Sequence, residues 1–451
     1  MLSPNIAARL AKYEAGHMEV HDVIGVGFGP SNIGLAIALK EDFAAENIGK
    51  SFVFLDSKPK HSWHHPMMLP NAKMQISFMK DLCFLRNPSS NYTFVNYLHQ
   101  QKRLARFANM RDFNPSRKEF DDYLRWVAEQ FNDITRYASS VDTVHPVEKN
   151  GQITHLDVRV RHTGTHEVTT LRTRNLALAI GGQPSLPVDL KHSDVFHSSE
   201  FLQRINDYDQ ARPWRFLVVG AGQSAAEIYN YLINQSPQSD AHVVSSGIGF
   251  KQADDSVYVN EIFDHGMVNH FFELNEIERE KMLTKHYDTN YSVAALELIQ
   301  QIYRQEYEAS ITGGQQRFGI LKFSRLISLV QARSGIQAKL RSSLGAREYI
   351  HEADVIIFAT GYHRLHNHTL LKQLAPYLAS NDSKLKLSRN YALSTRDNFL
   401  PKIYIQGVSE ATHGLSDTLL SVISHRAYEI AKDIVSQNET YSLNGSLCCE
   451  S

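Results

Sequence analysis

Cysteine is scarce in this chain. Only three of the 451 residues are cysteines, Cys83, Cys448 and Cys449, and no Cys-x-x-Cys pair occurs. A disulfide-stapled fold, a zinc ribbon and a dithiol reductase all need paired cysteines, so the sequence argues against each of them. This pattern fits a reducing compartment, and we expect a cytoplasmic location.

Net charge and long apolar runs are lacking as well. Acidic and basic residues nearly balance, with a formal net charge of -1, so the composition predicts no nucleic-acid partner. No apolar run reaches the roughly 18–20 residues that a membrane-spanning helix needs, so we expect no transmembrane segment. Residues 1–20 also lack the apolar core of a secretory signal.

The histidines do not have the spacing of a metal site. His64 and His65 are adjacent, and His363, His366 and His368 cluster without a regular motif. Such histidines hold a metal only where further ligands converge. Packing within loops is the favoured interpretation at both places, and no metal is predicted.

What the chain does have is a glycine-rich turn between an apolar strand and a helix, within residues 21–32. In a dinucleotide-binding fold, the first glycine (Gly25) makes the tight turn. The second (Gly27) lets backbone N–H groups approach a pyrophosphate at the helix N-terminus. Gly29-Pro30 stands where the final glycine is expected. The next apolar strand ends in Asp56, and an acid there commonly accepts hydrogen bonds from an adenosine ribose.

A second copy of this unit lies downstream, in residues 216–227. It reads as strand, Gly220-Ala221-Gly222 turn and helix, with Ala225 in place of the third glycine. A single match is weak evidence, but two units in one chain predict a flavoprotein with two dinucleotide sites.

The strand after the second unit ends at Ser245-Ser246. It carries no acid, which argues against selection of NADH through the ribose 2′-hydroxyl. It carries no arginine either, the usual partner of a 2′-phosphate, although Lys251 is nearby and could serve.

Several longer motifs point to a known family. They are residues 25–32 (Gly-Val-Gly-Phe-Gly-Pro-Ser-Asn), 74–82, 222–227, 254–256 with 259–261, 289–293, 358–362 and 413–421. On these motifs the chain resembles the flavin-dependent N-hydroxylating monooxygenases over about residues 20–435. It is most similar to the L-ornithine N5-monooxygenases. The segment 63–70 looks closer to the L-lysine N6-hydroxylases.

The resemblance implies a set of site residues. FAD would contact Gly25, Gly27, Gly29, Pro30, Asp56, Trp63, His64, Gln75, Val141, Thr418, Leu419 and Leu420. NADPH would contact Ala221, Gly222, Gln223, Ser224, Ser246, Asn290, Tyr291 and Ser292. The substrate would contact Lys80, Asn260, Glu261, Phe263, Asn290 and Ser421, with Asn290 as the catalytic residue. Ser246 stands where the family usually has an arginine for the 2′-phosphate, so the choice between NADPH and NADH stays open.

The resemblance also implies an activity. It is hydroxylation of the side-chain amine of L-ornithine, with NADPH and O2, through a C4a-hydroperoxyflavin, in hydroxamate siderophore biosynthesis. L-lysine, putrescine or histamine as substrate is the alternative. A different flavin monooxygenase is a remoter one, since it should lack the combination of Lys80, Asn260 and Asn290. Relatives are often homotetramers.

The expected fold class is α/β, with two Rossmann-like dinucleotide-binding domains and a smaller, mostly helical insertion. We expect residues 18–204 and 363–436 to form the FAD domain, and 205–253 and 311–362 the NADPH domain. The insertion that binds substrate would span residues 254–310, and residues 437–451 would form a flexible tail.

Overall fold

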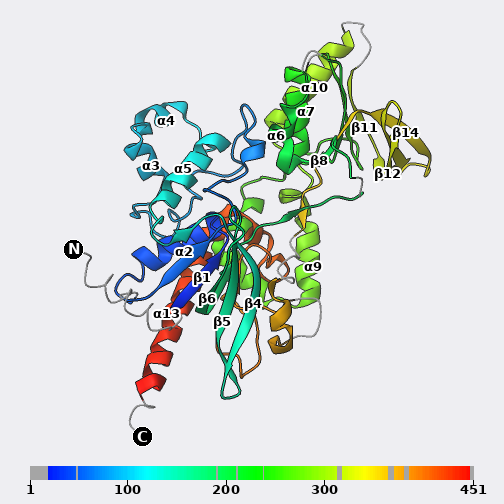
Figure 1. Ribbon diagram of the computed structural model, residues 1–451. Helices are drawn as coiled ribbons and strands as arrows, with labels where there is room; N and C mark the ends of the chain where they lie inside the picture. Colours follow the sequence, from blue (N-terminus) through cyan, green and yellow to red (C-terminus); the bar gives the residue numbers. More distant parts are fainter. Residues whose placement is uncertain are drawn as a thin grey trace.

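Two sheets, one mixed and one parallel, organise the computed structural model of the chain, and each contains a strand that leads into one of the glycine turns (Figure 1). The structure describes residues 19–446 except 47–48, 189–190, 210–211, 237, 312–316, 364–369 and 380–384. The expected α/β class with two dinucleotide-binding domains is confirmed. Residues 1–18, where no secretory signal was expected, lie outside the described residues, as do His366, His368, Cys448 and Cys449.

The first sheet carries the first glycine turn. Its strands are β1 (Val20–Val26), β2 (Phe52–Leu55), β3 (Thr135–Arg136), β4 (Ser139–Lys149), β5 (Gln152–His162), β6 (Val168–Leu178) and β17 (Lys402–Ile405). The order is β3-β2-β1-β6-β5-β4, and β17 also pairs with β6. The pairs around β1 are parallel, whereas β4, β5 and β6 form an antiparallel meander. Side chains of β1 point into cores on both faces, as a near-continuous apolar strand requires.

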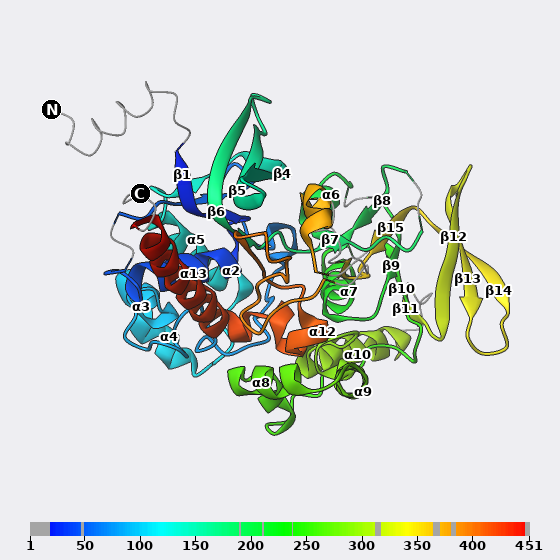
Figure 2. The same ribbon diagram turned by 90° about the horizontal axis from the view of Figure 1, so that it is seen from below.

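Helices cover the first sheet. Helix α2 (Pro30–Glu41) follows the turn and packs against α13 (Ile423–Ser446), the long helix near the C-terminus (Figure 2). The two helices approach closely at Gly34, where a β-carbon would lie 2.8 Å from Cγ2 of Ile423. A helical lobe of α3 (Phe94–Gln100), α4 (Leu104–Met110) and α5 (Arg117–Glu129) lies beside them. Its apolar face includes Phe120, Tyr123 and Val127.

The second sheet carries the second glycine turn and is parallel throughout. Its order is β11-β10-β9-β15-β8, from β8 (Val195–His197), β9 (Arg215–Val219), β10 (Asp240–Val244), β11 (Phe318–Leu321) and β15 (Val355–Phe358). Helices α6 (Phe201–Ile205), α7 (Gln223–Gln235) and α10 (Leu296–Ile311) accompany it. The strands β12 (Ser324–Ala332), β13 (Gly335–Ser342) and β14 (Glu348–Ala353) form a separate antiparallel sheet at its far side (Figure 1). A ribbon of β7 (Gln183–Pro184) and β16 (Tyr362–His363) lies where the chain passes between the two domains.

The insertion between β10 and β11 is mostly helical. It contains the short helix η3 (Val259–Phe263), α8 (His265–Glu273), α9 (Glu276–Lys285) and the turn η4 (Tyr287–Thr289). Near the C-terminus, the short helices α12 (Glu410–His413), η6 (Leu415–Thr418) and η7 (Leu420–Val422) precede α13. Helix α8 contacts α12, and η3 contacts η6, so the insertion packs beside these short helices.

The structure differs from the expected boundaries at three places. Strand β8 lies before residue 205, yet it pairs with β15 of the second sheet. Helix α10 lies inside the expected insertion, but it packs against α7 and buries Ile302 in the second domain. Helix α13 extends to Ser446 and so enters residues 437–451, the expected tail. The other domain boundaries stay predictions.

Among the described residues, no helix combines the length and the apolar character needed to cross a membrane.

Candidate active site

The first glycine turn has an open space in front of it. Gly27 has φ +83°, and a β-carbon there would lie 2.4 Å from the carbonyl oxygen of Ala179. Gly29 is the N-cap residue of α2, so no side chain caps the helix there. A β-carbon at Gly29 would have no neighbour within 4 Å. The first turn of α2 contains no acidic side chain. Free N–H groups at a helix start, with room in front, fit the pyrophosphate of a dinucleotide.

The second turn repeats this geometry. Gly220 has φ +128°, and its β-carbon would lie 2.3 Å from the carbonyl oxygen of Ala359. Gly222 is the N-cap of α7 with φ −90° and ψ −172°, against −91° and −172° for Gly29. Ser224 and the half-buried Ala221 lie at the same turn. The two units are therefore structural copies, and both fit a dinucleotide phosphate.

This equivalence corrects the expected glycine register. Gly27, Gly29 and Asn32 match Gly220, Gly222 and Ala225, whereas Gly25 lies inside β1 and makes no turn. Gly25 is small for a packing reason, because a β-carbon there would lie 2.2 Å from Cδ1 of Phe54. Alignment of Gly27-x-Gly29 in the first unit with Gly220-x-Gly222 in the second would have found the register from the sequence.

Asn32, which the sequence analysis missed, fixes the first turn. Its fully buried amide donates to the carbonyl oxygens of Gly27 (2.7 Å), Ala177 (3.2 Å) and Val26 (3.3 Å). Its own oxygen accepts a 2.8 Å hydrogen bond from Nε2 of Gln406, just after β17. The amide thus ties the turn to strands β1, β6 and β17.

Gly27 provides a sharp test of this turn. We expect Gly27→Ala to lower the free energy of unfolding by clearly more than the about 1–2 kcal/mol that a non-glycine residue costs in the left-handed region. The reason is that the added methyl group would clash with backbone atoms. The variant should also lose bound flavin. Gly151→Ala is the matched control, since Gly151 has φ +77° but open space around its β-carbon position. Denaturant unfolding and flavin absorbance measure both effects, and equal costs would contradict the argument.

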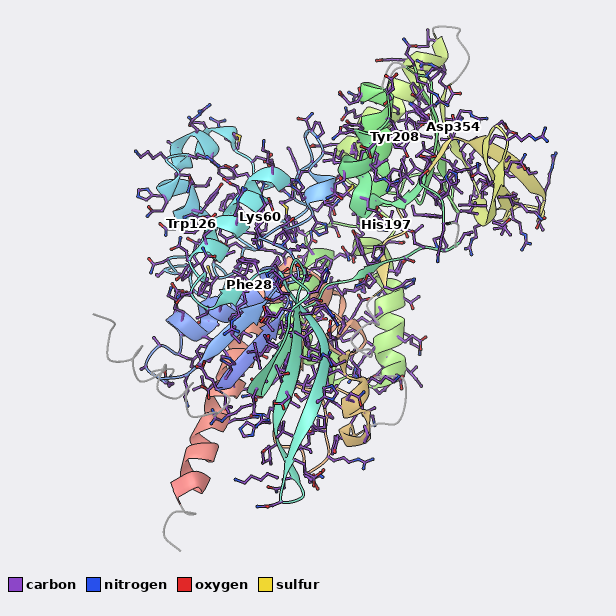
Figure 3. The ribbon with its side chains drawn as sticks, in the orientation of Figure 1. Phe28, Lys60, Trp126, His197, Tyr208 and Asp354 are labelled. Carbon is purple, nitrogen blue, oxygen red and sulfur yellow. The ribbon has the colours of Figure 1, made fainter. Side chains whose placement is uncertain are left out.

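The residues expected along FAD surround the first turn. Asp56 accepts hydrogen bonds from the backbone N–H groups of Phe28 (2.8 Å) and Lys58 (2.9 Å), so its carboxylate braces the turn. Each oxygen keeps a further lone pair for a ribose hydroxyl. Phe28 marks this edge of the sheet in Figure 3. Trp63 packs against Phe120 and, edge-on, against His64. The remaining expected residues are Gln75, which is exposed, and Val141 of β4, which is half-buried.

The loop that carries Trp63 and His64 also joins the two domains. It continues into Met67, Leu69 and Ala72, which are buried in the core of the second domain. Behind it, Arg117 of α5 forms a bidentate ion pair with Glu227 of α7, at 2.7 and 2.8 Å.

The Gln223 side chain extends the Arg117–Glu227 contact within the second domain. It donates to Glu227 (2.8 Å) and accepts from the backbone N–H of Ala295 (2.8 Å). Because of these contacts, the two glycine turns are held in one packed unit.

The segment Asn290–Ser292 bridges the two sites. A β-carbon on Gly222 would lie 3.8 Å from Cα of Ser292, a residue with φ +58°. The Tyr291 hydroxyl donates to the Glu410 carboxylate and lies 3.4 Å from Oγ1 of Thr418. The structure therefore brings expected NADPH contacts and an expected FAD contact together, with half-buried Asn290 beside them.

Residues 418–421 are anchored by a buried ion pair. Arg426 bonds the Asp417 carboxylate at 2.9 Å, and their side chains are 1% and 0% exposed. Arg426 also donates to Oγ of Ser31 in the first turn of α2 (2.9 Å). Leu419 and Leu420 follow, half-buried, and Ser421 is buried. The pair thus places these residues next to the first glycine turn.

Lys80 is held at the end of a tightly bonded loop. Its backbone N–H donates to Ser77, while its half-buried ammonium has no hydrogen bond or ion pair within the described part of the chain. The neighbouring Asp81, missed by the sequence analysis, accepts from the N–H groups of Cys83, Phe84 and Phe94. Burial raises the pKa of Asp81 to about 6.

The other expected substrate residues lie on η3. Asn260 donates to the carbonyl oxygen of Asp255 (2.8 Å), Phe263 is buried and Glu261 is exposed. Because η3 contacts η6, Asn260 is placed near the Thr418 segment. No hydrogen bond or ion pair joins Lys80 to Asn260 among the residues that the structure describes.

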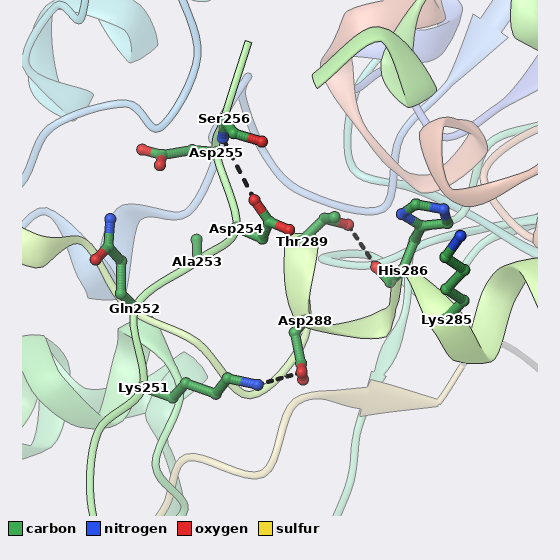
Figure 4. A pocket seen from close by; sticks show the side chains of 10 residues that line it. All are labelled: Lys251, Gln252, Ala253, Asp254, Asp255, Ser256, Lys285, His286, Asp288 and Thr289. Atoms are coloured by element: carbon green, nitrogen blue, oxygen red, sulfur yellow. Dashed lines mark hydrogen bonds and ion pairs between the residues drawn. The ribbon is translucent and has the colours of Figure 1, made fainter. Parts of the chain in front are cut away.

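A cavity of about 460 Å³ opens in the insertion (Figure 4). It is lined by residues 251–256, 285–286 and 288–289, so none of the expected substrate residues faces it. Lys251, considered above for a 2′-phosphate, forms an ion pair here with Asp288. That pairing neutralises its ammonium. No group of three or more potential metal ligands occurs in the described ranges.

Two equivalent dinucleotide turns in one packed unit, with polar residues gathered between them, define a two-dinucleotide flavoprotein. The second lobe, marked by His197 and Tyr208 in Figure 3, carries the turn for the second dinucleotide. Across residues 19–364 the chain matches the family model described as L-lysine 6-monooxygenase/L-ornithine 5-monooxygenase. The chain belongs to this family.

Individual relatives agree. An L-ornithine N(5)-monooxygenase of Pseudomonas aeruginosa is 38% identical over 91% of this chain and 93% of its own length. The solved structure of ornithine hydroxylase (PvdA) from the same species has a TM-score of 0.87, covering 93% and 99% of the two chains, at 38% identity. A Kutzneria sp. 744 ornithine N-hydroxylase, solved as KtzI-FADred-NADP+-L-orn, has a TM-score of 0.89 at 34% identity, covering 93% and 100%.

Proposed function

We propose that this protein hydroxylates the side-chain amine of L-ornithine, using FAD, NADPH and O2, for hydroxamate siderophore biosynthesis. The observation that carries the proposal is the Asn290–Ser292 segment, which contacts the Gly222 turn on one side and Thr418 on the other. A substrate beside Asn290 would therefore lie between the two cofactor sites. The relatives support the choice of substrate and cofactors.

Each cofactor fits the turn assigned to it. FAD would lie at Gly27 and Gly29 with Asp56, and NADPH at Gly222 with Gln223 and Ser224. When bound, FAD takes electrons from NADPH and supplies the oxygen activation. The protein's own residues then have to bind, orient and shield the substrate.

The substrate residues divide that work. The Lys80 ammonium would bind the α-carboxylate, because a charge-assisted hydrogen bond is the strong kind and no described residue competes for it. Asn260 would bind the α-amino group. Asn290 is neutral, so it can hold the reacting amine by hydrogen bonds without adding a charge that repels it. Ser421 and Phe263 would help to exclude water around it.

L-lysine, putrescine and histamine are the alternative substrates. A cytoplasmic location and assembly into a homotetramer are further parts of the proposal, supported by the few cysteines and by family resemblance.

The test is hydroxylamine formation from L-ornithine, L-lysine, putrescine and histamine in parallel, with FAD and NADPH supplied. We expect product from L-ornithine at the highest kcat/KM. A preference for L-lysine would shift the substrate by one methylene at the same site. Product only from the amines without a carboxylate would overturn the role of Lys80, and no amine-dependent product would overturn the activity.

A further inference from the structure

The second domain lacks a cation at the position where a 2′-phosphate is usually bound. Ser245 and Ser246 follow β10, and the segment 245–250 contains no charged residue. The Ser245 hydroxyl is used within the loop, accepting from Gly247 N–H (3.2 Å) and donating to the Gly249 carbonyl (3.4 Å). Ser246 is exposed. Its hydroxyl can donate to a phosphate, but it brings no positive charge.

The chain after the neighbouring strand places a lysine across from the Ser245–Gly247 stretch. Strand β11 runs parallel to β10, with Leu321 paired to Val244. The N–H of Ser245 donates to the Leu321 carbonyl (3.2 Å), and the N–H of Phe323 donates to the Gly247 carbonyl (2.7 Å). Lys322 lies between these two hydrogen bonds in the chain that follows β11, and Ser246 lies between them in the chain that follows β10.

Lys322 is also available for a ligand. Its side chain is exposed, and its ammonium has no hydrogen bond or ion pair to any residue that the structure describes. Lys251, the other nearby lysine, is paired with Asp288 instead. Ile248, in the same loop as Ser246, is 69% exposed and offers an apolar surface to an adenine ring.

We propose that Lys322 binds the 2′-phosphate of NADPH, together with the Ser246 hydroxyl, and so replaces the missing arginine. A lysine ammonium is a compact charge that suits a phosphate oxygen. The residue that sets coenzyme preference therefore follows β11 and not β10. The inference rests on the proposed position of NADPH at the Gly222 turn.

The test is equilibrium binding of NADP+ and NAD+ to the FAD-loaded enzyme, by calorimetry, without turnover. We expect Lys322→Ala to weaken NADP+ about tenfold, as loss of one exposed phosphate contact implies, and to leave NAD+ within about twofold. Adding S246R to Lys322→Ala should restore NADP+ binding. Arg325→Ala is the control, because Arg325 is an exposed cation nearby on β12, and it should change neither affinity by more than about twofold.

The possible outcomes distinguish a failure of the role of Lys322 from a failure of the proposed NADPH position. Unchanged NADP+ binding in Lys322→Ala, or an equal loss for Arg325→Ala, would overturn the role of Lys322 alone. An equal loss for NADP+ and NAD+ would also overturn it, because it would show a structural effect. If mutation of Gly222 to a bulky residue left both affinities intact, the position of the coenzyme itself would be wrong.

Discussion

Replacement of Lys80 by alanine should raise the KM for L-ornithine by about 10- to 100-fold, the value of a hydrogen bond of about 1.5–3 kcal/mol to a charged group. The physical reason is that Lys80 is half-buried and its ammonium has no partner in the described part of the chain, so the carboxylate of the substrate would be its counter-ion. Steady-state hydroxylamine formation measures the change. The kcat should fall less, since the proposed partner of Lys80 is the α-carboxylate and not the reacting amine.

Two controls sharpen this result. Putrescine has no carboxylate, so its KM should stay the same or fall in Lys80→Ala. Lys73→Ala removes a lysine of the same segment whose exposed ammonium is already paired with Asp112, and we expect less than about a twofold effect. An unchanged KM for ornithine in Lys80→Ala would remove Lys80 from the substrate site.

The second large effect is expected at the buried Arg426–Asp417 pair. Arg426→Met should lower the free energy of unfolding by about 3–5 kcal/mol, because it leaves the Asp417 carboxylate buried without its charged partner. The variant should also lose bound flavin, since Arg426 holds both the 417–418 segment and Ser31. Denaturant unfolding and flavin content after purification are the two measurements.

A matched pair on the sheet surface gives the contrast. Arg172→Met breaks the part-exposed ion pair with Asp157, whose loss should cost no more than about 1 kcal/mol and no flavin. The double variant Arg426→Met with Asp417→Asn should recover part of the stability, because no buried charge is left uncompensated. Full flavin content in Arg426→Met would contradict the anchoring role of the pair.

Local sequence patterns predicted much of the fold. Each glycine turn follows an apolar strand and opens a helix, and these are short-range signals that recur in the structure. The register within the first turn was predicted wrongly, because Gly25 looks like part of the motif. Only packing against Phe54 shows why it is a glycine. The sequence also did not indicate why Asn32 replaces a third glycine, because one of its hydrogen-bond partners is a carbonyl on a distant strand.

Contacts between distant segments could not be read from the sequence. Arg117 and Glu227 belong to different domains, and nothing in either local pattern indicates that they pair. Met67 and Leu69 read as loop residues of the first domain but are buried in the second. Lys322 stands apart from the nucleotide motif, and only the pairing of β10 with β11 brings it near the Ser245–Gly247 stretch. These contacts depend on the order of strands in each sheet and on how the domains pack, and the hydrophobic periodicity of a sequence predicts neither.

The way the first turn is held together has a consequence for biosynthesis. Ser31 and Asn32 emerge early from the ribosome, but their partners Arg426 and Gln406 are translated near the end. A nascent chain can therefore form β1 and α2 without a finished flavin site. We therefore expect flavin to be bound only after nearly the whole polypeptide has been synthesised, and a product terminated before Gln406 to stay without flavin.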